Sequence, residues 1–181
     1  MTETLASIWL AIVEEFSDIA DAAEATRIVL RLLMAILLGA AIGYERETQG
    51  KAAGLRTHML VSLGAAIFVL VPLQGGMPEA DVSRVLQGIV AGIGFLGAGA
   101  IIKLSGHEEV KGLTTAASVW VAAGIGIAAG MGREATAIVS TLAALFILAV
   151  VKRLEKHIDP PPRRLGLPES PDRRETSQTK E

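Results

Sequence analysis

Five apolar stretches, each nearly free of ionisable side chains, limit most tightly what this chain can fold into. They are residues 28–44, 58–73, 85–102, 113–130 and 136–151. Each has about 16 to 18 residues, close to the length that an α-helix needs to cross the hydrocarbon core of a bilayer. A soluble helix bundle is excluded because the stretches leave no polar faces to meet water. We therefore predict an all-α, polytopic membrane protein with about five transmembrane helices.

The segments on either side of this membrane region differ from it in composition. Residues 1–26 carry apolar side chains such as Ile8 and Trp9 at helical spacing, opposite an acidic face. They predict an amphipathic helix at the membrane surface or, alternatively, against a partner. The N-terminus lacks the cationic region of a secretory signal, so we expect it to be retained. Residues 27–157 form the predicted membrane domain, and the proline-rich, charged residues 158–181 predict a disordered cytoplasmic tail.

The distribution of Lys and Arg predicts how the chain is oriented. The loops after the first and third stretches, together with the tail, carry ten Lys or Arg near the membrane, whereas the alternate segments carry four. Cytoplasmic loops are the ones enriched in these residues. We therefore expect the N-terminus outside and the C-terminus in the cytoplasm.

An internal repeat relates the first two stretches to the next two. Residues 38–67 align with residues 96–125 without a gap, at an offset of 58 positions, and nine positions are identical. Each copy consists of a helix, a loop and a second helix in the same orientation. This predicts two parallel hairpin repeats related by a pseudo-twofold axis along the membrane normal, with the fifth helix outside the pair.

The third stretch is rich in glycine. Small residues let helix backbones approach closely in lipid, so we expect this helix to be central, with close neighbours on two faces. The alternative is a broken helix that lines an ion path. The candidate packing residues are Gly88, Gly92, Gly94, Gly97 and Gly99.

Polar residues gather where the helices should meet the cytoplasm. Threonine at these positions can cap a helix, but Arg56 and His58 add charged or titratable groups beyond what a cap requires. A hairpin should also bring Arg56 beside Glu45 and Arg46, because charges left unpaired at that depth are costly. The predicted cytoplasmic polar cluster is Glu45, Arg46, Arg56, Thr57, His58, Thr114 and Thr115.

Other kinds of chemistry find little support in the sequence. No hydrolase, metalloprotease or phosphate-loop motif is present, and the chain contains no cysteine, so we predict no catalytic residue and no cofactor. Its net charge of -2 gives no basic face for nucleic acid. Candidate metal ligands are Glu45, Glu108 and Glu109, with ion pairing or solvation as the alternative explanation.

Four blocks of sequence, spread over about residues 30–151, resemble the MgtC/SapB family of bacterial inner-membrane proteins. They are GYERE (43–47), AAGLRTHMLVSLGAA (52–66), GIVAGIGFLGAGAII (88–102) and VKGLTTAASVWVAAGIG (110–126). The resemblance implies a plasma-membrane protein linked to Mg²⁺ limitation or stress survival, in a short form without the C-terminal cytoplasmic domain of the best-known member.

The function that we expect from this resemblance is non-enzymatic. The chain would be a membrane regulator that contacts another membrane protein, such as the membrane sector of the F-type ATP synthase, or a second copy of itself. The alternative is a small-ion (Mg²⁺) or solute transporter that uses the two repeats as halves.

Overall fold

The computed structural model describes residues 2–15, 21–103 and 110–151 of the 181-residue chain. Within these ranges the helices are α1 (Thr2–Glu15), α2 (Ala22–Thr48), α3 (Leu55–Gln74), α4 (Glu79–Gly99), α5 (Leu113–Gly130) and α6 (Glu134–Phe146). A π-helical turn, η1 (Ile147–Val151), continues α6. Two short strands, β1 (Ile102–Lys103) and β2 (Val110–Lys111), pair antiparallel between α4 and α5. The predicted tail lies outside the described residues.

Four of the helices, α2 to α5, are long and apolar enough to cross a membrane. The fifth apolar stretch forms a shorter apolar helix, Glu134–Val150. The chain is therefore an all-α, polytopic membrane protein, as predicted. A helix also forms at 2–15, and its large apolar side chains are exposed, including Leu5, Ile8, Trp9, Leu10, Ile12 and Val13.

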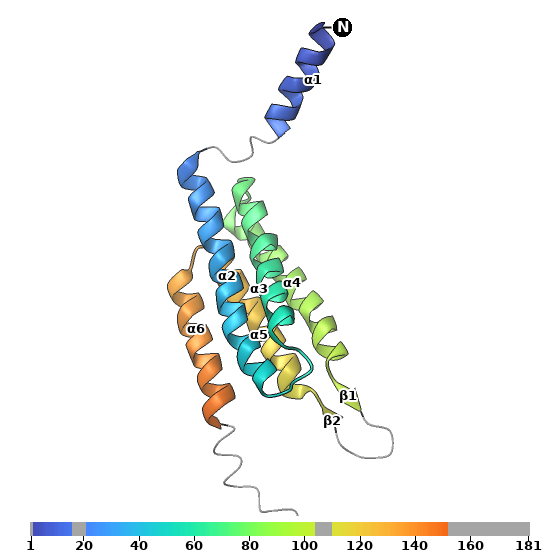
Figure 1. The fold of residues 1–181 in the computed structure, drawn as a ribbon, viewed down its shortest axis with the longest axis vertical. Helices are drawn as coiled ribbons and strands as arrows, with labels where there is room; N and C mark the ends of the chain where they lie inside the picture. The colour runs from blue at the N-terminus through green and yellow to red at the C-terminus, as the bar shows by residue number, and fades with distance from the viewer. Residues whose placement is uncertain (1, 16–20, 104–109, 152–181) are drawn as a thin grey trace, which may run out of the picture.

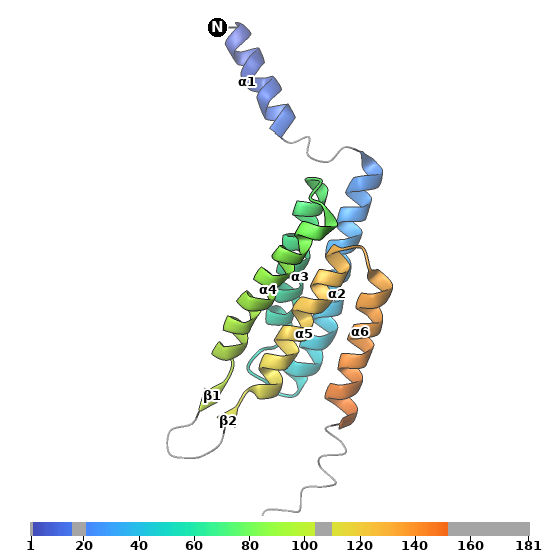
Figure 2. The same cartoon turned by 180° about the vertical axis from the view of Figure 1, so that it is seen from behind.

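Helix α5 lies at the centre of the bundle. Half of the apolar 18-residue segment of α5 is buried, compared with 17% of the corresponding segment in α2, 33% in α3 and 22% in α4. Helices α2 and α3 pack against it, while α4 and α6 lie on opposite sides (Figures 1 and 2). The prediction that the third stretch is central is therefore wrong, because that stretch is α4.

The two hairpins α2–α3 and α4–α5 run in the same direction, as the repeat predicted (Figure 1). Their contacts also repeat at the offset of 58. A Cβ atom on Gly39 of α2 would lie 2.7 Å from the backbone oxygen of His58, and one on Gly97 of α4 would lie 3.7 Å from the Cβ of Ala116. Equivalent residues thus face each other in both hairpins, with looser packing in the second.

The two ends of the bundle are built differently. We call the end that carries residues 49–54, 100–103 and 110–112 the loop end, and the end that carries residues 75–78 the turn end. The turn between α5 and α6 is held beside α2, where Arg31 Nη1 donates to the backbone oxygen of Gly130 at 3.4 Å. A cation at the C-terminus of a helix is favourable because the free carbonyl groups there carry partial negative charge.

Candidate functional site

A buried histidine joins α3 to α5 near the loop end. The His58 side chain is fully buried, and its Nδ1 lies 2.8 Å from the backbone oxygen of Gly54. Because a carbonyl oxygen only accepts, Nδ1 carries the proton of this bond. On the other side of the ring, Nε2 lies 3.0 Å from Ser118 Oγ, which is itself 2.9 Å from the backbone oxygen of Thr115. The ring therefore holds the first turns of α3 and α5 in one arrangement.

A buried ion pair lies close to this histidine. Arg46 is 2% exposed, and its Nη1 is 3.7 Å from Glu45 Oε2. Glu45 Oε1 accepts a hydrogen bond from Gln49. Three polar atoms of the pair, Arg46 Nε, Arg46 Nη2 and Glu45 Oε2, are buried without a hydrogen-bond partner among the described residues, as is Ser62 Oγ. Both charged groups act electrostatically on the His58 ring. Together Glu45, Arg46, His58, Thr115 and Ser118 form what we call the loop-end cluster.

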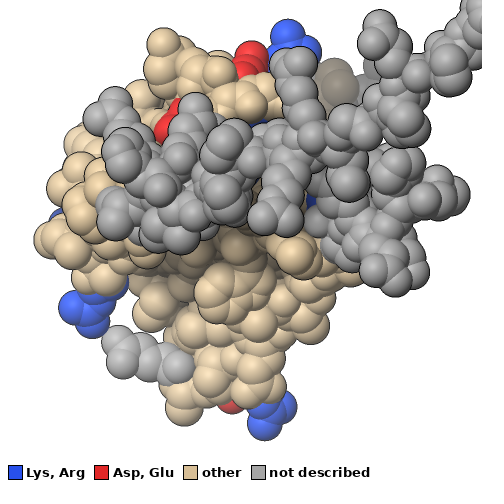
Figure 3. Space-filling view, turned by 90° about the horizontal axis from the view of Figure 1, so that it is seen from below, with Lys and Arg blue, Asp and Glu red and all other residues tan. Residues whose placement is uncertain are grey.

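The structure brings together only part of the predicted cytoplasmic cluster. Glu45, Arg46, His58 and Thr115 belong to it, whereas Arg56, Thr57 and Thr114 are exposed. Within the described ranges, Arg56 makes no ion pair with Glu45, which pairs with Arg46 instead. In Figure 3, which views the bundle from the loop end, the visible charged side chains are scattered around the margin and do not form one patch. The contact predicted between Arg56 and the Glu45–Arg46 pair is thus not formed.

The helix caps also differ from the expectation. The N-cap residues of α3 and α5 are Gly54 and Gly112, which have no side chain to accept a backbone N–H. Instead Glu47 Oε2, from the end of α2, accepts the backbone N–H of Leu55 at 2.7 Å. A carboxylate satisfies a free donor there and favours the positive end of the helix dipole. At α3 a longer side chain from the preceding helix thus reaches the free N–H group in place of Thr57.

Of the three candidate metal ligands, one lies within the described residues and two lie outside them. Glu108 and Glu109 lie outside the described ranges. Glu45 is inside them, but it faces Arg46 and Gln49. Among the described side chains, no group of three His, Cys, Asp or Glu residues could hold a metal ion.

Close helix contacts are made by glycines of α2 and α5, outside the predicted packing set. A Cβ on Gly43 of α2 would lie 2.7 Å from Leu55 Cα, and one on Gly130 of α5 would lie 2.5 Å from the backbone oxygen of Ala66. Gly39 and Gly126 make equally close contacts with α3. The sequence contains these glycines as two pairs, Gly39 with Gly43 and Gly126 with Gly130, each spaced four residues apart. This spacing favours close approach of helices in membranes and could have identified the contacts.

The selected glycines of α4 behave differently. A Cβ on Gly88, Gly92, Gly94 or Gly99 would meet no atom of the described residues within 4 Å. Only Gly97 packs on a neighbour, Ala116 of α5. Among the five selected glycines, Gly97 is thus the one that a described neighbouring helix approaches.

Comparison with known proteins places this architecture. The sequence model of the MgtC family matches residues 32–157. The chain is 43% identical over 140 residues to protein SrpB of Synechococcus elongatus, an alignment that covers 70% of this chain and 75% of SrpB. It is 41% identical over 131 residues to protein MgtC of Salmonella typhimurium, covering 72% of this chain and 55% of that protein.

A third relative carries a functional description. YhiD of Escherichia coli K12, named as a candidate magnesium transporter, is 39% identical over 133 residues, covering 70% of this chain and 61% of YhiD. The alignments thus span less than two thirds of MgtC and of YhiD. No solved structure matches the chain. The family match covers most of the membrane domain, including the loop-end cluster and the tight glycines, and the chain belongs to the MgtC family.

Proposed function

We propose that this chain is a non-enzymatic membrane regulator of the bacterial plasma membrane that acts through helix contacts with another membrane protein under Mg²⁺ limitation. The observation that carries the proposal is the closed middle of the bundle. Between the loop-end cluster and the Arg31 contact, α5 meets α3 through backbone and small side chains, with Gly126 against Ser62 and Gly130 against Ala66. Ala35, Ala122 and Ala129 nearby are fully buried. Such packing leaves no room for a hydrated ion.

The exposed surface supports the same reading. Large apolar side chains face outward along the whole described bundle, among them Leu33, Leu37, Phe68, Phe95, Trp120 and Leu142. Lipid or a neighbouring membrane helix can cover such a surface equally well, because neither offers it water. A protein without an internal path can thus still act on a partner within the bilayer, and the membrane sector of the F-type ATP synthase is the partner that the family resemblance suggests.

Transport of Mg²⁺ or a solute is the second candidate. It is favoured by the unpartnered atoms of Glu45 and Arg46, which could receive polar ligands at the loop end. The description of YhiD as a candidate magnesium transporter points the same way for that relative. If the protein is a transporter, the closed middle of the bundle has to open during each transport cycle.

Reconstitution in liposomes separates the two functions. The purified protein should give no Mg²⁺ flux above that of empty vesicles, while it restores growth in low Mg²⁺ when expressed in a strain that needs it. Flux that is lost in a Glu45→Gln/Arg46→Gln double variant, but kept in the exposed variant Arg56→Gln, would overturn the regulator proposal. The double variant removes both charges together, so it leaves no unpaired buried charge behind.

A further inference from the structure

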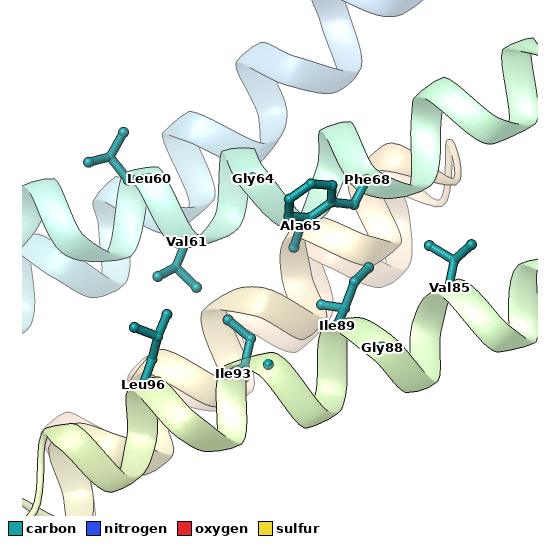
Figure 4. A pocket seen from close by; sticks show the side chains of 11 residues that line it. Leu60, Val61, Gly64, Ala65, Phe68, Val85, Gly88, Ile89, Ile93 and Leu96 are labelled. Atoms are coloured by element: carbon teal, nitrogen blue, oxygen red, sulfur yellow. The ribbon is translucent and has the colours of Figure 1, made fainter.

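An apolar groove of about 610 Å³ runs between α3 and α4. Val61 and Ala65 of α3 face Ile89, Ile93 and Leu96 of α4 across it (Figure 4). Its lining extends along α4 from Val85 to Leu96, about 18 Å of helix at 1.5 Å per residue, and contains no charged side chain. The groove is therefore long, narrow and confined to the apolar part of the bundle.

The repeat indicates what kind of group fits this groove. On α2, Ala35 belongs to a buried cluster that includes Ala137 of α6, and Met34 and Leu38 pack against that cluster. At the offset of 58, Met34 and Leu38 correspond to Gly92 and Leu96 of α4, which line the groove and are exposed. Ala35 corresponds to Ile93, which belongs to a buried cluster with Val119 and Ala123 of α5. A face of α2 that is packed inside the chain thus corresponds to a face of α4 that stays partly open among the described residues.

The glycines of the groove also favour a helix over an acyl chain. Gly88 and Gly92 are spaced four residues apart, and a Cβ on either would meet open space, as would one on Gly64 across the groove. The other two pairs with this spacing, in α2 and α5, are in close contact with a neighbouring helix. A fluid acyl chain gains little from a missing Cβ, whereas a helix backbone can approach through it.

We propose that the groove is the interface of a homodimer, in which α4 of a second copy lies against Gly88 and Gly92 of the first. Copies inserted with the same orientation can be related by a twofold axis along the membrane normal, and such an axis needs only one self-complementary patch. Helix α6, which covers α2, runs in the same direction as α2 and α4 (Figure 1). By the repeat, the helix that covers α4 should therefore also run parallel to it, as α4 of a second copy in the same orientation does.

Charges at the turn end of the groove fit a second copy. Asp81 and Arg84 are exposed, and among the described residues neither forms an ion pair. Asp81 lies one turn before Val85 on the groove face, and Arg84 lies beside it. The twofold axis brings Asp81 of one copy near Arg84 of the other. Because the site is open to water, this ion pair adds little to the affinity of the two copies, and its main effect is to fix the register of the two α4 helices.

Disulfide cross-linking in native membranes tests the proposal, because the chain has no cysteine of its own. Gly88→Cys and Gly92→Cys should each give a disulfide-linked dimer on oxidation. Gly94→Cys is the matched control, since Gly94 is also open but lies about 200° around α4 from Gly92. We expect at least a fivefold higher dimer yield at the two groove positions. Equal yield at Gly94, or no dimer at any position, would overturn the proposal in favour of another face, a different protein or lipid as the occupant.

The mass of the protein in nanodiscs provides an independent measurement. The native chain should be dimeric, Gly92→Leu monomeric and Gly94→Leu dimeric. Gly92 has open space within its own chain, so its leucine variant should still fold, and its melting temperature as a monomer can be checked against that of Gly94→Leu. A Gly92→Leu protein that stays dimeric, or a native protein that is monomeric at the same lipid ratio, would refute the interface.

Discussion

The contact between α3 and α5 at Gly126 gives the sharpest test of how this bundle is held together. A Cβ at this position would overlap the backbone oxygen of Ser62, and it would lie 2.8 Å from the carbonyl carbon of that residue. Ordinary van der Waals contact begins at 3.4 Å, so the two helices must move apart by at least 0.6 Å to admit one methyl group. The obstacle is backbone, which cannot rotate away as a side chain can.

We expect Gly126→Ala to lower the free energy of unfolding by about 3 kcal/mol, at the upper end of the usual range for overpacking. Gly124→Ala is the matched control, because Gly124 lies two residues away on the same helix and its Cβ would meet nothing within 4 Å. Alanine there should be neutral or stabilise by at most about 1 kcal/mol, since it removes the backbone entropy of glycine.

Both free energies can be measured by unfolding in mixed detergent micelles with increasing SDS, followed by far-ultraviolet circular dichroism and by the fluorescence of Trp9 and Trp120. The reasoning fails if Gly126→Ala unfolds at the same SDS fraction as Gly124→Ala. It also fails if both variants lose the same amount of stability, because the loss would then reflect the alanine and not the contact with α3.

Two further predictions concern the hydrogen bond of the buried histidine and the orientation of the chain. Ser118→Ala leaves Nε2 of the buried His58 ring without its partner and should cost about 1–3 kcal/mol in the same unfolding assay, whereas Thr114→Ala, at an exposed position, should stay within about 0.5 kcal/mol of the native value. Equal losses would show that the bond contributes nothing. If the N-terminus is outside, a single cysteine at Gln74 should react with an impermeant maleimide added to intact cells, and one at Gln49 should react only after the cells are opened; the reverse pattern would invert the topology.

The outline of the fold was predictable because it depends on composition and spacing. Long apolar stretches predict spanning helices whatever lies beside them, and the offset of 58 predicted two parallel hairpins. The partner of each helix was less predictable. Gly39 with Gly43 and Gly88 with Gly92 have the same spacing, yet only the first pair meets a neighbour inside the chain. Spacing determines which side chains share a face, but the packing of the whole bundle decides what that face meets.

The position of the candidate site was also predictable from the sequence, but its side-chain contacts were not. Its place at the loop end follows from the order of Glu45, Arg46 and His58 along the hairpin. The direction of individual side chains does not, because Arg56 and His58 lie two residues apart and thus point about 200° from each other on α3. His58 turns into the bundle toward Ser118, and Arg56 turns out to the surface.

The short fifth helix has a consequence for the lipid around the protein. Residues 134–150 extend about 25 Å at 1.5 Å per residue, whereas the hydrocarbon core of a typical bilayer is about 30 Å thick. The apolar part of α2, residues 28–44, has the same length. Lipid that adjoins either helix must match about 25 Å, so the bilayer is drawn thinner than its usual thickness beside both. Such a hydrophobic mismatch favours thin membranes for this protein.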